Sequence, residues 1–341
     1  LDLAKNHNVH LADLKISEVR RSIKQHKSIN TYKLDVLNEK KLLSFIKNAD
    51  IVLLAVPGHL GYNALKAIIK CGKNVVDISF SPENIMDLNN IAIQNNVTAI
   101  FDAGVAPGLP NYILGYHNSL EKISSFKYYV GGLPKFPKKP FNYKAPFSPI
   151  DVIEEYTRPA RMKIDGINIT KPALSEVERI TFKNYLELEA FNTDGLRSLL
   201  QTMNHIKNMS EKTLRYPGHV KLIRSYIDKG ILQTNDTIKK LLKEWKLEPK
   251  EPEYTILKVE IYTNKKIINY ELYDEYDKQS DISSMARTTG YTATASINLI
   301  LEELFIKKGI YPPEMVSEDK IIFDFILKYL QERDVIIKKY I

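Results

Sequence analysis

The chain has 341 residues, of which 44% are hydrophobic and 26% are charged. This length is enough for two domains with separate cores, and the composition is that of an ordinary globular protein. The net charge of +8 comes from 49 basic and 41 acidic residues, and the lysines are scattered among the acids. A nucleic-acid binder usually gathers its positive charge in one stripe, so we expect no nucleic-acid partner.

Cysteine content and hydropathy exclude further classes of protein. Cys71 is the only cysteine, which excludes an internal disulfide and a multi-cysteine metal site, and we expect no bound metal. The longest apolar runs, such as the one between Asp50 and Pro57, are far shorter than a membrane span. We therefore expect a cytoplasmic protein with no membrane partner and no signal peptide.

Short apolar strands alternate with helices through the first hundred residues. The pattern predicts strands over 9–13, 28–34, 50–56, 74–80 and 97–101, and helices over 18–26, 38–47, 61–70 and 82–95. Alternation of this kind is typical of a parallel sheet, and continuous apolar strands indicate a sheet covered on both faces. The predicted fold class is therefore α/β, with a Rossmann-type doubly wound parallel sheet.

The chain opens with Leu1 to Lys5, which reads as the last turns of a helix already under way. The sequence contains no G-x-G-x-x-G motif, the usual pyrophosphate loop of a dinucleotide-binding unit. We expect the first strand and this Gly-rich loop to lie upstream of Leu1. The alternative is a protein that does not bind a pyrophosphate in the usual way.

The strand ends supply the candidate cofactor residues. An acid at the end of the strand over 9–13, here Asp13, can accept hydrogen bonds from the adenosine ribose and repel a 2′-phosphate. Asp13 therefore favours NAD over NADP, although a surface aspartate that starts a turn is the alternative. The other expected cofactor residues also lie at strand ends: Asp35, Ala55, Val56, Pro57, Ser79, Phe80 and Asp102.

The run from Phe101 to Asn111 holds two glycines and two prolines between an apolar strand and a helix that opens near Tyr112. Such a segment leaves backbone exposed at the carboxyl end of a strand, where open α/β sheets bind their ligands. We therefore expect this run to face a ligand and to connect the first domain to the second.

Longer strands begin at Ser124. Strands are predicted over 126–134 and in the pairs 177–182 with 185–191 and 256–262 with 267–273, and helices over 195–208, 219–229, 237–246, 292–308 and 317–331. These strands indicate an inserted α+β substrate domain with a mostly antiparallel sheet. The predicted domains are 1–122 for the Rossmann domain, 123–290 for substrate binding and dimerisation, and 291–341 for helices that pack back on the first domain.

Two polar segments of the second domain, 148–159 and 212–219, place arginines and aromatic residues beside proline or glycine. An arginine there can hold a substrate carboxylate with two parallel hydrogen bonds, although a surface ion pair is its commoner role.

Six segments together resemble the saccharopine dehydrogenase family, most closely its lysine 6-dehydrogenase branch: 77–84, 101–108, 130–134, 148–160, 213–219 and 284–290. The resemblance covers nearly the whole chain in the family's order. It implies a Rossmann domain with an inserted substrate domain, a nicotinamide cofactor, a small amino-acid substrate and a homodimer formed through the second domain.

The resemblance also implies roles for single residues. Ser79 and Phe80 match positions at the cofactor and substrate, and a loop on the nicotinamide side is matched by Val105, Ala106 and Pro107. The family's substrate-binding tripeptide is matched by Thr213, Leu214 and Arg215, followed here by Tyr216. Thr193 stands where saccharopine-forming relatives carry an arginine. The loss of that arginine puts binding of a glutarate carboxylate in doubt, although Arg197 is close enough to compensate.

These residues lead us to predict NAD-dependent oxidative deamination of L-lysine at its ε-carbon, which gives a semialdehyde that closes to a cyclic imine, and ammonia. Arg215, with Arg158, is the expected carboxylate clamp. The base for the ε-ammonium is Glu154, Asp194 or His219, and the sequence does not rank them. The alternatives are a saccharopine or carboxynorspermidine dehydrogenase and, from another class, a non-catalytic nucleotide-binding module.

Overall fold

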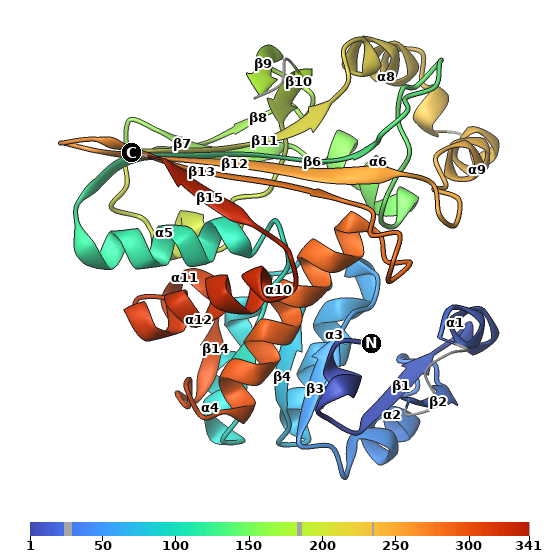
Figure 1. Cartoon of the computed structure of the whole chain (residues 1–341), viewed down its shortest axis with the longest axis vertical. Coiled ribbons are helices and arrows are strands. Elements are labelled where there is room, and N and C mark those ends of the chain that lie inside the picture. Colours follow the sequence, from blue (N-terminus) through green and yellow to red (C-terminus); the bar gives the residue numbers. More distant parts are fainter. Residues whose placement is uncertain (24–28, 183–185, 234, 341) are drawn as a thin grey trace. The chain divides into compact units, whose positions relative to one another are not determined.

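The computed structural model describes residues 1–23, 29–182, 186–233 and 235–340, and Figure 1 shows the elements. The chain divides into two compact units, the first formed by residues 1–103 with 291–313 and the second by residues 104–290 with 314–341. The predicted domain ranges differ from these units, because residues 104–122 and 314–341 group with the second unit.

The first unit contains two parallel sheets. One pairs β1 (Val9–Asp13) with β2 (Ile29–Lys33). The other has the order β14-β5-β4-β3, formed by β3 (Ile51–Leu54), β4 (Asn74–Asp77), β5 (Thr98–Ile100) and β14 (Gly309–Tyr311). Every strand pair of these two sheets is parallel, and the buried residues of β4 and β5 are continuous along the chain. The predicted α/β class is confirmed.

The helices of the first unit follow the strands as predicted, with shifted ends: η1 (Leu3–Lys5), α1 (Ile16–Ser22), α2 (Glu39–Ile46), α3 (Gly58–Lys70), η2 (Ile85–Leu88) and α4 (Asn89–Gln94). α2 begins where the Asn38 side chain accepts a hydrogen bond from the Lys41 amide at 3.1 Å. The predicted helix over 82–95 is divided into η2 and α4, and the predicted residues 24–28 lie outside the described ranges.

The second unit is built on one large mixed sheet, with the strand order β15-β13-β12-β6-β11-β10-β9 and a hairpin of β7 and β8 attached to β11. Among the described strand pairs of this sheet, only β6 and β11 are parallel, so the predicted mostly antiparallel sheet is confirmed. The strands are β6 (Ile123–Pro134), β7 (Ala160–Ile164), β8 (Ile167–Lys171), β9 (Glu178–Phe182), β10 (Leu186–Asn192), β11 (Asn208–Arg215), β12 (Glu253–Thr263), β13 (Ile267–Glu275) and β15 (Ile337–Tyr340).

Helices cover this sheet. α5 runs along one face, and α12 packs on α5 (Figure 1). The remaining core is rich in aromatic rings around Trp245, whose side chain is fully buried. The helices are α5 (Leu109–Leu120), α6 (Pro149–Thr157), α7 (Leu199–Thr202), α8 (His219–Asp228), η3 (Ile231–Gln233), α9 (Asn235–Glu244), α11 (Pro313–Val316) and α12 (Lys320–Gln331), while α10 (Ser284–Leu301) runs from the second unit into the first. No described helix is long and apolar enough to cross a membrane.

The predicted helix over 195–208 is wrong. Only the four residues of α7 are helical there, and the chain then enters β11 at Asn208, a strand that the sequence did not predict. β11 has no apolar alternation because its buried residues include Glu211, Thr213 and Arg215. The predicted helix over 292–308 is also shifted, since α10 begins at Ser284 and ends at Leu301.

Candidate active site

The carboxyl ends of β3, β4 and β5 meet at one edge of the parallel sheet, because these strands pair in parallel. Most predicted cofactor residues follow these ends: Ala55, Val56 and Pro57 after β3, Ser79 and Phe80 after β4, and Asp102 after β5. Ala55 and Pro57 are exposed, whereas Ser79 and Asp102 are buried. The structure thus brings these residues together where open parallel sheets bind ligands.

Asp77 fixes the turn after β4. Its carboxylate accepts hydrogen bonds from the Ser79 amide at 2.9 Å and from the Ser79 hydroxyl, and its carbonyl accepts one from the Ala103 amide at 3.2 Å. The Ser79 side chain therefore holds this turn, and it is the loop backbone and the half-buried Phe80 that remain at the edge of the sheet.

Two glycines let α3 approach this turn closely. A Cβ at Gly58 would collide with the Phe80 carbonyl, and a Cβ at Gly61 would collide with the hydroxyls of Ser79 and Ser81. The start of α3 is thus packed directly against the loop at the ligand-binding edge.

Asp13 and Asp35 lie at the carboxyl ends of β1 and β2, and both are exposed. Asp13 accepts a hydrogen bond from the Lys15 amide at 2.6 Å, and Asp35 accepts one from the Leu37 amide at 3.0 Å. One carboxylate oxygen of each can still meet a ribose hydroxyl. The geometry equally fits an aspartate that starts a turn, which was the alternative reading of Asp13.

Val105, Ala106 and Pro107 form a tight loop at the start of the second unit. The Gly104 amide donates to the Pro107 carbonyl at 3.1 Å, and the Leu109 amide donates to the Gly104 carbonyl at 3.0 Å. Gly108, which follows, has φ +139°, a value that favours glycine, and a Cβ there would collide with Gly104. Because α5 begins at Leu109, the loop is held rigidly at the start of a helix.

Arg215 ends β11 and is the centre of a buried polar network in the second unit. It is 2% exposed, and its guanidinium carbon lies 4.3 Å from the ring centroid of Tyr143 and 5.5 Å from that of Tyr156. Its Nε donates to the Tyr156 hydroxyl at 2.7 Å, and its Nη2 donates to the Glu155 carboxylate at 3.3 Å. The predicted clamp is therefore already paired with a carboxylate of the protein, and it orients Glu155.

His219 has both ring nitrogens engaged. Nδ1 lies 2.8 Å from the Phe141 carbonyl oxygen, and Nε2 lies 2.9 Å from the Tyr156 hydroxyl. A carbonyl only accepts, so Nδ1 carries the proton and Nε2 accepts from Tyr156. Burial, with the charge of Arg215, lowers the pKa of His219 to about 3. His219 is therefore neutral, and this geometry supports a positioning role for it rather than the predicted role of base.

A line of polar groups leads from Glu155 into the core. The Thr213 hydroxyl hydrogen-bonds the Glu155 carboxylate and lies 2.8 Å from the Thr193 hydroxyl, which lies 2.6 Å from the Glu211 carboxyl. Burial, reinforced by the charge of Glu155, raises the pKa of Glu211 to about 8. Glu211 is 3% exposed, whereas the Glu155 side chain is 17% exposed. Glu155 is thus the accessible end of this line.

The other predicted acids belong to ion pairs. Glu154 pairs with Arg158 at 3.2 Å along α6, and its side chain is 44% exposed. Asp194 accepts two hydrogen bonds from the Arg161 guanidinium, at 2.8 Å to Nη2 and 2.9 Å to Nε. Both carboxylates are thus held by arginines other than Arg215.

Leu214 and Tyr216 hold the end of β11. Leu214 is fully buried, and a Cβ on Gly131 of β6 would lie only 2.9 Å from the Leu214 Cβ. The Tyr216 hydroxyl donates to the Pro134 carbonyl at 2.9 Å and accepts from the Tyr254 hydroxyl at 3.1 Å. Of the predicted tripeptide, Thr213 and Arg215 reach the network, whereas Leu214 packs against β6.

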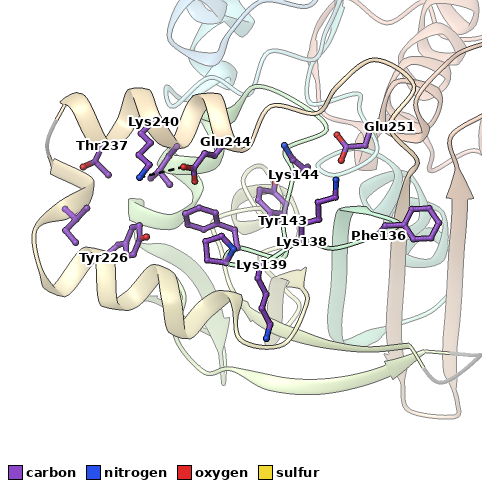
Figure 2. A pocket seen from close by; sticks show the side chains of 14 residues that line it. Phe136, Lys138, Lys139, Tyr143, Lys144, Tyr226, Thr237, Lys240, Glu244 and Glu251 are labelled. Carbon is purple, nitrogen blue, oxygen red and sulfur yellow. Dashed lines mark ion pairs between the residues drawn. The ribbon is translucent and has the colours of Figure 1, made fainter.

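A pocket of about 540 Å³ in the second unit shares Tyr143 with this network (Figure 2). The Tyr143 hydroxyl is buried without a hydrogen-bond partner among the described residues. Lys240 and Glu244, both at the pocket, pair at 3.8 Å. The wall carries more basic than acidic groups and so favours an anionic ligand; its charged and aromatic side chains are Lys138, Lys139, Lys144, Lys240, Glu244, Glu251, Phe136, Phe141, Tyr143 and Tyr226.

Sequence reasoning missed four residues of the network: Tyr143, Glu155, Tyr156 and Glu211. A helical signal was present for Glu155, since Val152, Ile153 and Tyr156 form the buried face of α6 and Glu155 lies nearer to that face than Glu154 does. Glu211 alternates with Thr213 and Arg215 and so shares their strand face, a signal that is visible only once β11 is recognised as a strand.

The fold defines the class of protein: an α/β chain with a Rossmann-like parallel sheet in one unit and a mixed sheet with a buried polar site in the other. Two domain models match it. The saccharopine dehydrogenase NADP binding domain matches residues 1–100, and the saccharopine dehydrogenase C-terminal domain matches residues 104–336. The chain therefore belongs to the saccharopine dehydrogenase family, which confirms the predicted resemblance.

Curated relatives are distant. A mitochondrial alpha-aminoadipic semialdehyde synthase of Mus musculus is 26% identical over 220 residues, which are 60% of this chain and 24% of that protein. A saccharopine dehydrogenase (NADP(+), L-glutamate-forming) of Schizosaccharomyces pombe is 26% identical over 246 residues, which are 68% of this chain and 54% of that protein. The chain thus spans about a quarter of the first relative and about half of the second.

A solved structure shows the same fold. The apo histidine-tagged saccharopine dehydrogenase (L-Glu forming) of Saccharomyces cerevisiae superposes with a TM-score of 0.78 at 18% identity, over 99% of this chain and 95% of that one. This likeness confirms the predicted combination of a Rossmann-like sheet with a mostly antiparallel one.

The residues at the sheet edges fit parts of a nicotinamide dinucleotide. Asp13 and Asp35 each present an exposed carboxylate suited to ribose hydroxyls, and the backbone around Ala55, Pro57 and Phe80 is available at the edge of the larger sheet. The predicted preference for NAD is not supported, because the family description and the name of the S. pombe relative both specify NADP.

Proposed function

We propose that this chain is a nicotinamide-dependent dehydrogenase that oxidises a carbon–nitrogen bond of a lysine-related amino acid, with the ε-carbon of L-lysine as its leading target. Family membership over both units supports the class of reaction. The observation that carries the proposal is Glu155, a partly exposed carboxylate held by the buried Arg215 and by Thr213. When bound, the nicotinamide supplies the hydride acceptor.

Glu155 is the base of this proposal. An alkyl ammonium has an unperturbed pKa of about 10.4 and must lose a proton before its carbon can give up a hydride. Glu155 can attract the ammonium and accept that proton, while Arg215 and Thr213 fix the direction of its two oxygens. We prefer it to Asp194 and His219 because it is more exposed than either, and to Glu154 because Glu154 pairs with Arg158 rather than with the network around Arg215.

Thr193 favours lysine over a bulkier acidic substrate. Its hydroxyl faces Thr213 and Glu211, so no cation occupies the position where saccharopine-forming relatives were expected to carry arginine. Arg197, the predicted substitute, is only 8% exposed. A substrate with an amine and a single carboxylate therefore suits this part of the site better than one with a glutarate arm.

A second candidate substrate is saccharopine. The names of the S. pombe relative and of the superposed S. cerevisiae structure both specify saccharopine dehydrogenase. The pocket that shares Tyr143 with the network has a surplus of lysines, which suits a substrate with several carboxylates. A homodimer formed through the second unit stays a prediction for either substrate.

Turnover of the two amino acids separates the candidates. The chain is incubated with L-lysine or saccharopine and with NAD⁺ or NADP⁺, and the reduced nicotinamide is followed by absorbance while ammonia and glutamate are assayed. We expect reduction with lysine alone and release of ammonia. Turnover of saccharopine but not of lysine would overturn the leading proposal, and nucleotide binding without turnover of either would favour a non-catalytic module.

Two neighbouring glutamates give a matched test of the base. Glu155→Gln should lower kcat by about 10²-fold or more, as loss of a general base does. Glu154→Gln removes one of the three bases predicted from the sequence, which lies in an exposed ion pair, and should lower kcat by much less. A larger loss in Glu154→Gln than in Glu155→Gln would contradict the assignment.

A further inference from the structure

We propose that Glu211 is kept in its acid form and that the hydroxyls of Thr193 and Thr213 form a relay that can carry its proton to Glu155. The inference deepens the proposed function. The use of the proton in catalysis rests on the proposed function, whereas the presence of the proton on Glu211 does not. The proposed function and the protonation of Glu211 can therefore fail separately.

The proton count along the line requires an acid. Three close contacts join four groups: Glu155 to Thr213, Thr213 to Thr193, and Thr193 to Glu211. Each contact needs one proton between its oxygens, but the two threonine hydroxyls supply only two. The third proton must therefore belong to a carboxyl group, at one end of the line or the other.

The surroundings assign this proton to Glu211. Glu155 accepts an N–H of the buried Arg215, so a cation already faces its carboxylate. Glu211 faces Glu155 from α6 and Asp194 from the loop after β10, and Asp194 is already neutralised by Arg161 of β7. No described cation contacts Glu211. A buried carboxyl without a cation and near two other carboxylates stays protonated.

The backbone around Glu211 is shaped for this arrangement. The Gly195 amide donates to Glu211 at 3.1 Å, and the Gly195 carbonyl accepts a hydrogen bond from the Tyr128 hydroxyl at 2.7 Å. A Cβ at position 195 would lie 2.7 Å from the carboxyl carbon of Glu211. Glycine is thus required there, and its amide is in place to stabilise Glu211 once the proton has left.

The transfer is a shift of three protons along the line. The O–H bond of Glu211 breaks as one forms on Thr193, the original Thr193 proton moves to Thr213, and the original Thr213 proton moves to Glu155. The net change converts Glu211 from acid to carboxylate and Glu155 from carboxylate to acid. No electron is transferred and no further reactant is needed.

This relay lets Glu155 alternate between base and acid. After a proton has been taken from the amine, hydrolysis of the resulting imine needs an acid at the departing nitrogen. Glu155 can deliver a proton that comes from Glu211 through the threonines. The proton that Glu155 next takes from a substrate ammonium then returns along the same line, so Glu211 is again an acid at the end of the cycle. The residue at position 193 therefore determines whether the proton held by Glu211 can reach Glu155.

Infrared spectroscopy tests the presence of the proton without any reaction. The difference spectrum of wild type minus Glu211→Gln at neutral pH should show the C=O stretch of a protonated carboxylic acid, which shifts in ²H₂O. Glu318→Gln is the control, because Glu318 is exposed and its difference spectrum should lack that band. Absence of the band from the Glu211 difference spectrum would overturn the proposal.

Two substitutions at Thr193 test the relay. Thr193→Val removes the hydroxyl at nearly constant volume and should lower kcat by about 10²-fold with little change in KM, whereas Thr193→Ser keeps the hydroxyl and should retain most of the activity. The pH profile of kcat should change for valine and not for serine.

The outcomes are separable. A carboxylic band that survives in Thr193→Val, together with the activity loss, supports both parts of the inference. Equal activity of the valine and serine variants would overturn the relay even if the band is present. If wild type turns over neither amino acid, the proposed function fails, while the infrared band still decides whether Glu211 holds a proton.

Discussion

The two units differ in where they keep their polar groups. In the first unit the strand interiors are aliphatic, with Val75, Val76 and Ile100 fully buried, and the candidate ligand residues lie beyond the strand ends. In the second unit the candidate residues Glu211, Thr213 and Arg215 lie within a buried strand. The parallel sheet thus carries its candidate ligand residues at its edge, whereas the mixed sheet carries charged side chains within its core.

The difference has energetic consequences. Apolar packing stabilises the strand interiors of the first unit, where substitutions that conserve volume are tolerated best. In the second unit every buried charge depends on a particular partner, since an unpaired buried charge is far more costly than a pair. Substitutions and pH changes should therefore affect the two units in different ways.

The largest expected effect is the loss of Arg215. Arg215→Met should destabilise the second unit by about 3–5 kcal/mol, because it leaves Glu155 without its buried partner. Lys135→Met, which removes an exposed ion pair with Glu275, should change stability by less than about 1 kcal/mol. Denaturant unfolding of both variants gives the comparison, and similar midpoints for the two would contradict the special role of the buried pair.

Packing in the first unit is tested at Gly61. Gly61→Ala should destabilise by about 1–3 kcal/mol, because its Cβ would collide with Ser79 and Ser81. Gly290→Ala is the matched control: this glycine lies within α10 with nothing near its missing Cβ, so alanine should stabilise by about 0.5–1 kcal/mol. Thermal unfolding measures both, and a neutral Gly61→Ala would show that the turn after β4 can yield.

Buried carboxylic acids should make the second unit less stable as pH rises. Burial raises the pKa of Glu211 to about 8 and that of Glu253 to about 7, above the unfolded value of about 4.3. The folded state keeps these protons while the unfolded state loses them, so stability is highest below the unfolded pKa and falls as pH rises toward the folded pKa values. Between pH 6 and 7, Glu211→Gln should reduce the loss of unfolding free energy by about 1.4 kcal/mol. An unchanged slope would mean that Glu211 is already ionised in the folded protein.

The smallest expected effect concerns Asp13. Asp13→Asn removes an exposed charge, and exposed charge pairs contribute about 0.2–1 kcal/mol, so affinity for NADP⁺ relative to NAD⁺ should rise by no more than about fivefold. Titration with both nucleotides measures the ratio. An unchanged ratio would leave Asp13 as an aspartate that only starts a turn.

Apolar patterning predicted the strands of the first unit well, and it was most direct for β4 and β5, whose residues are buried almost without interruption. The same reasoning failed at β11, which reads Asn-Met-Ser-Glu-Lys-Thr-Leu-Arg. Its buried residues include the polar Glu211, Thr213 and Arg215, so the strand lacks the apolar alternation that would have identified it. The strand is stabilised by its neighbours β6, β10 and β7, and such long-range pairing leaves no local signal.

The site was predicted in part for a related reason. The family resemblance located Thr213 and Arg215, which the structure places in the buried network. Which carboxylate faces Arg215 depends on how α6 packs beside β11, so the sequence reasoning named Glu154 among the candidate bases and missed Glu155. Tyr143 joins the network from a long loop, and neither its position nor its contact with Arg215 could be inferred from spacing.

The glycine doublet of β6 limits how this family member can evolve. A side chain at Gly131 would meet Leu214, and one at Gly132 would meet Pro146 and Met285, so the two faces of the strand are closed at consecutive positions. In a library of all single substitutions, both positions should tolerate almost no replacement, although neither residue has any chemistry of its own. Selection for the approach of β6 to the Arg215 strand would then appear as invariance at two residues that have no side chain.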